Sequence, residues 1–177
     1  MILVSLFITY YLVRPKVVEA HYAEAYGEII AFRGDLNKAV NVPVYPSEQA
    51  VWNQILTIGN GSIVKNITIA FKDAGESENP YYIIQEIELH NKIGFLFLKK
   101  YDFIPGFKAI EVESYENLPG LIQAPIIAIV HPEFSNETAI RVDGHVILLK
   151  AKTHEDMDLV TAKLFIILFD LKPIENK

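Results

Sequence analysis

Segments in which apolar and polar residues alternate at a spacing of two recur along the chain. They are residues 64–71, 81–90, 139–142, 145–150 and 159–169. Such alternation is typical of strands that turn one face toward a core. Clusters of Gly, Pro, Asn and Asp separate the segments at intervals of roughly ten to fifteen residues, as in sandwiches and barrels. The pattern therefore predicts an all-β fold, an antiparallel β-sandwich of jelly-roll or immunoglobulin-like type.

Two local signals refine this prediction. In residues 18–32, apolar and aromatic side chains fall at helical spacing, which predicts the chain's one helix, although Gly27 interrupts it. The pair Asp143-Gly144 lies between two alternating segments and predicts a tight hairpin there.

The N-terminal segment, residues 2–13, is uncharged and strongly apolar. As a helix it would span roughly 18 Å, less than the ~30 Å hydrocarbon core of a bilayer. Its positions at spacing two form an unbroken apolar face, as in a buried strand: Ile2, Val4, Leu6, Ile8, Tyr10 and Leu12. Three interpretations stay open, namely a first strand of the same domain, a strand donated to another subunit, and a trimmed membrane anchor or signal.

Charge and composition narrow the functional classes. The formal net charge is −6 and lysines are scattered, so the chain offers no basic patch to a nucleic-acid backbone. Cysteine is absent, which excludes disulfides and thiolate metal sites. The mean hydropathy of +0.22 is high for a soluble monomer, and it indicates apolar surface that meets a membrane or another subunit.

Three sequons for N-glycosylation begin at Asn60, Asn66 and Asn136. Asn60 lies in a predicted turn, Asn136 in a polar loop, and Asn66 on the polar face of a predicted strand. More sequons occur than chance would give for this composition, which favours an extracytoplasmic location.

No constellation of catalytic or metal-binding residues is evident. The histidines are separated in sequence and show no metal-ligand spacing: His21, His90, His131, His145 and His154. Residues 153–158, THEDMD, could bind a hard cation, but a solvated acidic turn is favoured. Arg33-Gly34-Asp35 matches an adhesion tripeptide and is interpreted as a turn. We therefore expect neither an enzyme nor a cofactor.

Residues 56–71, LTIGNGSIVKNITIAF, resemble a strand–turn–strand found in immunoglobulin-like and related β-sandwich modules of archaeal and bacterial surface proteins. The resemblance implies a cell-surface sandwich and no particular activity. In size and layout the chain is also similar to filament subunits that exchange an N-terminal strand.

The expected organisation is an apolar segment over residues 1–16 and a β-sandwich domain over residues 17–177. We expect a structural subunit of an extracellular filament or pilus, a homopolymer in which residues 2–13 complete the next subunit's sandwich. The alternatives are a membrane-anchored accessory protein that contacts a surface layer or motility apparatus, and a viral jelly-roll coat protein. A hydrolase or lectin on the same fold is the least favoured alternative.

Overall fold

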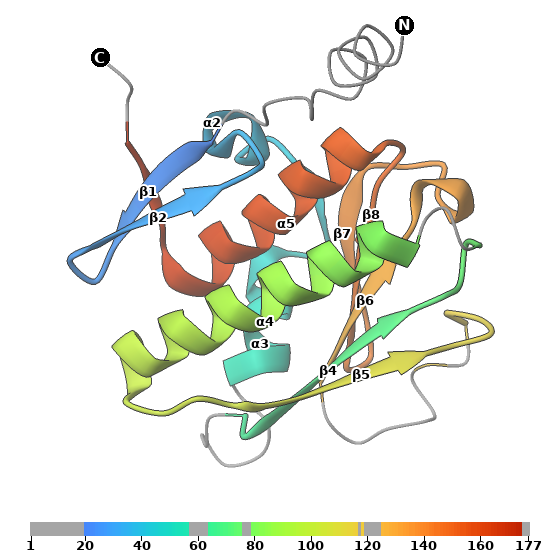
Figure 1. Ribbon diagram of the computed structural model, residues 1–177, viewed down its shortest axis with the longest axis horizontal. Helices are drawn as coiled ribbons and strands as arrows, with labels where there is room; N and C mark the ends of the chain where they lie inside the picture. The colour runs from blue at the N-terminus through green and yellow to red at the C-terminus, as the bar shows by residue number, and fades with distance from the viewer. Residues whose placement is uncertain (1–19, 57–63, 76–78, 117, 119–124, 175–177) are drawn as a thin grey trace, which may run out of the picture.

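The computed structural model describes residues 20–56, 64–75, 79–116, 118 and 125–174 (Figure 1). In chain order the elements are β1 (His21–Ala25), β2 (Glu28–Phe32), α2 (Leu36–Ala39), β3 (Val44–Tyr45), α3 (Glu48–Leu56), β4 (Asn66–Phe71), α4 (Asn79–Tyr101), β5 (Gly106–Glu111), β6 (Ile126–Val130), the 3₁₀ turn η2 (Pro132–Phe134), β7 (Ala139–Asp143), β8 (Val146–Lys150), α5 (His154–Phe169) and β9 (Lys172–Pro173).

A six-stranded mixed sheet forms the centre of the molecule, in the order β3-β7-β8-β6-β4-β5. Strands β8, β6, β4 and β5 are mutually parallel, and β7 runs antiparallel to β8. Helices connect or follow these strands, so the fold is α/β. The prediction of an all-β antiparallel sandwich is therefore wrong.

The central strand β6 has the sequence IIAIV, and all five of its residues are buried. Continuous apolar runs of this kind belong to parallel strands that are covered on both faces. The predicted strand at 64–71 is present as β4, and the predicted hairpin around Asp143-Gly144 is present as β7–β8.

Two predicted strands are helices. Residues 81–90 belong to α4 and residues 159–169 to α5. Most of α5 is buried, so nearly every position from 159 to 169 is apolar and the sequence fits a period of two as well as one of 3.6. Its ends carry clearer signals: Thr153 caps the N-terminus by accepting the Asp156 N–H, and Asp170 adopts the left-handed conformation at the C-terminus.

The helix predicted over residues 18–32 is instead the hairpin β1–β2. Tyr26 and Gly27 both have positive φ, 52° and 78°. Positive φ at both central residues is typical of a two-residue type I′ turn, whose twist matches that of the flanking strands. Turn geometry thus overrides the helical spacing of the aromatic residues. With β9, the hairpin forms a second, three-stranded sheet.

The two faces of the large sheet differ in how they are covered. Helices α4 and α5 lie across one face, where isoleucines of β4, β6 and β8 enter the main core (Figure 1). On the opposite face a smaller cluster buries Ala70, Leu118, Ile126, Ala128 and Val146. We call this second side the open face, because none of the described α-helices covers it.

The predicted apolar segment, including the proposed donor positions between Ile2 and Leu12, lies outside the described residues, as does Asn60. Among the helices that the structure describes, none combines the length and the apolar character needed to cross a membrane.

Candidate functional site at the carboxyl edge of the sheet

Strands β4, β6 and β8 end at the same edge of the sheet because they are parallel. After β4 the chain passes through α4 to β5, which pairs with one side of β4. Strand β6 pairs with the other side of β4, and β8 and β7 follow β6 in that direction. Such a reversal of strand order leaves a crevice at the carboxyl ends, where open α/β sheets bind ligands. Lys72 follows β4, His131 follows β6, and Lys150 ends β8.

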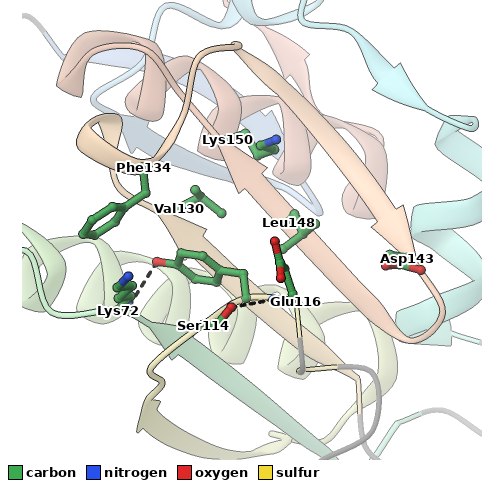
Figure 2. A pocket seen from close by; sticks show the side chains of 9 residues that line it. Lys72, Ser114, Glu116, Val130, Phe134, Asp143, Leu148 and Lys150 are labelled. Atoms are coloured by element: carbon green, nitrogen blue, oxygen red, sulfur yellow. Dashed lines mark hydrogen bonds between the residues drawn. The ribbon is translucent and has the colours of Figure 1, made fainter.

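A groove of about 330 Å³ lies on the open face at this edge (Figure 2). Val130 of β6 and Leu148 of β8 form an apolar floor, and the aromatic residues Tyr115 and Phe134 also line the groove. The complete lining is Lys72, Ser114, Tyr115, Glu116, Val130, Phe134, Asp143, Leu148 and Lys150. We call this hollow the open-face groove.

Tyr115 fixes the wall of the groove to the sheet. Its hydroxyl donates to the Ile129 carbonyl at 2.6 Å and accepts the Lys72 N–H at 3.0 Å. Burial raises the pKa of Tyr115 to about 12. The hydroxyl therefore remains a donor at neutral pH and joins the segment after β5 to the ends of β4 and β6.

The charges of the groove are separated along its length. Lys72 and Lys150 lie at the carboxyl ends of β4 and β8, and the Lys72 Nζ is 4.6 Å from the centroid of the Phe134 ring. Asp143 lies at the other end of the β7–β8 hairpin, opposite Val146. Lys150 lies four positions after Val146 along β8, which corresponds to ~13 Å. Together with Glu116, the groove thus has a cationic end and an acidic side.

Glu137 orients Lys150 from beside the groove. Its carboxylate accepts hydrogen bonds from the Arg141 Nε at 2.7 Å and the Lys150 Nζ at 2.6 Å. These bonds lower the pKa of Glu137 to about 2. Lys150 keeps further N–H donors because its ammonium has three.

Replacing Glu137 by Gln is expected to lower stability at pH 7, and the deficit is expected to shrink on acidification. The folded pKa of Glu137 is depressed, so its stabilisation is complete above the unfolded value near 4.5 and is lost as the pH falls toward 2. Urea unfolding of both proteins between pH 7 and pH 2.5 measures this difference. Glu113→Gln, a change at an exposed carboxylate, is the control; an E137Q deficit that does not depend on pH would contradict the assignment.

A second cluster lies at the same edge on the helix side. His131 and His154 approach with their Nε2 atoms 3.1 Å apart, and Tyr81 stacks on His154 at 4.1 Å between ring centroids. The Nδ1 of His131 accepts the Glu133 N–H at 3.2 Å. His131 therefore carries its proton on Nε2 and donates it to His154.

This tautomer bears on metal binding. A metal ion held by both Nε2 atoms would need a proton on the His131 Nδ1, which already faces the Glu133 N–H. Within the described ranges no group of three or more His, Asp or Glu side chains could hold a metal ion. The pair therefore fits a hydrogen-bonded link between the end of β6 and the start of α5.

Beneath the histidines, Asp158 is held in a buried polar network. Its Oδ1 accepts from the Gln85 Nε2 at 2.8 Å, and its Oδ2 lies 3.5 Å from an Arg33 nitrogen. The Thr161 hydroxyl donates to the Gln85 Oε1 at 3.3 Å. Burial raises the pKa of Asp158, against the opposing effects of Gln85 and Arg33. The network ties the end of β2 to α4 and α5.

The residues predicted from sequence are dispersed. Asn66 is exposed at the start of β4, and Asn136 is exposed after η2, beyond the carboxyl end of the neighbouring strand β6, so the two lie toward opposite edges of the sheet. Thr68, the third residue of the Asn66 sequon, is buried. Residues 153–158 are the cap and first turn of α5, so the acidic side chains Glu155 and Asp156 lie at a helix N-terminus. Arg33 to Asp35 is a turn, as predicted, and Asp35 caps α2.

The groove residues were missed by sequence reasoning. Lys72, Tyr115 and Lys150 are far apart along the chain and belong to no motif. The only available signal was that Lys72 and Lys150 each follow an apolar run, which becomes informative only when those runs are known to be parallel. Comparison of the chain with protein-family models, curated proteins and solved structures finds no match.

Proposed function

We propose that the chain is a binding domain that holds a short, zwitterionic peptide in the open-face groove. The observation that carries the proposal is the separation of charge over an apolar floor, with Lys72 and Lys150 at one end and Asp143 at the other. A ligand carboxylate would meet the lysines and a ligand ammonium the acidic side. No chemical step is part of this proposal.

The size of the groove supports a ligand of three or four residues. An extended peptide advances at most ~3.3–3.6 Å per residue, so four residues match the ~13 Å between the charged ends. The volume of about 330 Å³ lies at the lower end of ligand pockets. The Tyr115 and Phe134 rings and the Val130–Leu148 floor favour apolar side chains in the ligand.

A cell-surface location fits this function and remains part of the proposal. The sequons at Asn66 and Asn136 place their asparagines on exposed positions, where a glycan would stand in solvent. Neither asparagine lines the groove. Glycosylation at either site would therefore leave the groove accessible.

The test uses the tripeptide Leu-Ala-Leu and its N-acetylated and C-amidated forms, titrated into the full chain by isothermal calorimetry. We expect the free tripeptide to bind and each capped form to bind about 10-fold or more weakly, because each cap removes one charge-assisted contact. Lys72→Ala is expected to weaken binding roughly 10- to 100-fold.

Lys108→Ala is the matched control. Lys108 lies two residues from Ile110, which packs on the open-face cluster, so it is an exposed lysine of the same face outside the groove. Its replacement is expected to leave binding unchanged. Equal losses for K72A and K108A, or binding that does not respond to capping, would refute the proposed function.

A further inference from the structure

Helix α4 has a second apolar face that no described part of the chain buries. Its inner face is occupied by core residues such as Leu89, Ile93 and Leu96. On its outer face, large apolar side chains are exposed: Ile83 (53%), Ile84 (47%), Ile87 (51%), Phe95 (38%) and Leu98 (41%). Figure 1 shows α4 in front of the sheet, with this length of the helix unobstructed by other ribbons.

Four of these residues, Ile84, Ile87, Phe95 and Leu98, form one stripe together with the exposed Asn91. Positions 84, 87, 91, 95 and 98 are separated by three or four residues, so they follow one another along a single side of the helix. Ile104, 59% exposed, extends the stripe, since its Cγ2 lies beside Gly94. A helix that is apolar on both sides is normally covered on both sides.

The stripe is symmetric about Asn91. Ile87 and Phe95 each lie four residues from it, and Ile84 and Leu98 each lie seven. We propose that a second copy of this chain covers the stripe, with the two α4 helices antiparallel and a two-fold axis at Asn91. Ile84 then meets Leu98 of the second copy, and Ile87 meets its Phe95.

Asn91 favours a second copy over other occupants. At the two-fold axis its side-chain amide would lie against the same amide of the second copy, and each can donate a hydrogen bond to the other and accept one from it. A single polar residue in an otherwise apolar helix interface fixes the register of the two helices. The nearest cation, the Lys99 Nζ over the Phe95 ring, is paired with Glu28. The chain is also acidic overall, and both features disfavour an anionic membrane surface. An isologous contact closes as a dimer and does not propagate.

One helix pair buries little area compared with the ~800 Å² per partner of stable complexes. We therefore expect a dimer that dissociates on dilution. Sedimentation of the full chain over a hundredfold concentration range is expected to show a shift from dimer to monomer. Ile87→Glu is expected to abolish the dimer, whereas Val40→Glu, at an exposed apolar residue outside α4, is expected to retain it.

Cross-linking determines the register, because the chain has no cysteine of its own. With a short bis-maleimide, Asn91→Cys should cross-link to itself. Ile84→Cys alone should not, since its two copies would lie ~21 Å apart, but it should cross-link when mixed with Leu98→Cys. A parallel arrangement would reverse the last two results.

Other outcomes would overturn the inference. A dimer that survives Ile87→Glu and is lost when residues 1–15 are deleted would assign association to the N-terminal segment. A chain that remains monomeric but binds phosphatidylcholine vesicles through the stripe would assign the stripe to a membrane. A monomer at every concentration, with no cross-link at position 91, would refute the proposed dimer.

Discussion

Replacing Gly34 by alanine is expected to lower the free energy of unfolding by about 3 kcal/mol, at the upper end for overpacked sites. Gly34 follows β2 and lies directly against the backbone of α5. A Cβ there would overlap the main-chain oxygen of Asp158 and lie 2.5 Å from its carbonyl carbon. Because the obstacle is backbone, no side-chain rotation relieves it, and the hairpin would have to move away from α5.

The Gly34→Ala effect is measured by urea unfolding, with Gly94→Ala as the control. Gly94 lies within α4, and a Cβ there would make ordinary contacts of 3.5 Å with Ile104 and 3.8 Å with Phe107. Alanine is the better helix former by about 1 kcal/mol, so Gly94→Ala is expected to be neutral or stabilising. If both alanine variants lose equal stability, the close approach of Gly34 to α5 is not the cause.

The Gly34 contact illustrates which parts of the fold the sequence could predict. Strand β4 and the β7–β8 hairpin were predicted because their signals are local: alternation in one case and Asp143-Gly144 in the other. The turn at residues 33–35 was also predicted, but its glycine is required by a helix more than a hundred residues away. Nothing in the sequence around Gly34 indicates this contact with α5.

The sandwich prediction was wrong because period alone does not separate a buried helix from a buried strand. In residues 81–90, the helix buries Tyr82, Gln85 and Leu89 and exposes Ile83, Ile84 and Ile87. Apolar residues on both faces of α4 produced an apparent alternation. Ile84 and Ile87 also belong to the stripe, so the exposed apolar residues that obscured the helix are among those from which we infer a partner surface.

The groove could not be predicted for a related reason. Its position depends on strand order, and strand order depends on β6 entering the sheet between β4 and β8. Lys72 and Lys150 line the same open-face groove only because of that strand order. The proposed donor segment, in contrast, lies outside the described residues and stays a prediction.

Phe165→Ala is the substitution that most directly distinguishes helix from strand over residues 159–169. In α5, Phe165 is fully buried, 5.5 Å from Phe32 and 6.3 Å from Phe169 between ring centroids, whereas Ile166 is only partly buried. Removal of the Phe165 ring is expected to cost about 3–5 kcal/mol, and Ile166→Ala about 1 kcal/mol. In a strand, the predicted inward set was Val160, Ala162, Leu164, Ile166 and Leu168, so the order would be reversed. Urea unfolding of the two variants therefore tests the α5 helix itself. A larger loss of stability for Ile166→Ala would favour the strand. A larger loss for Phe165→Ala is expected from the helix, because there the Phe165 ring packs against Phe32 of the β1–β2 hairpin.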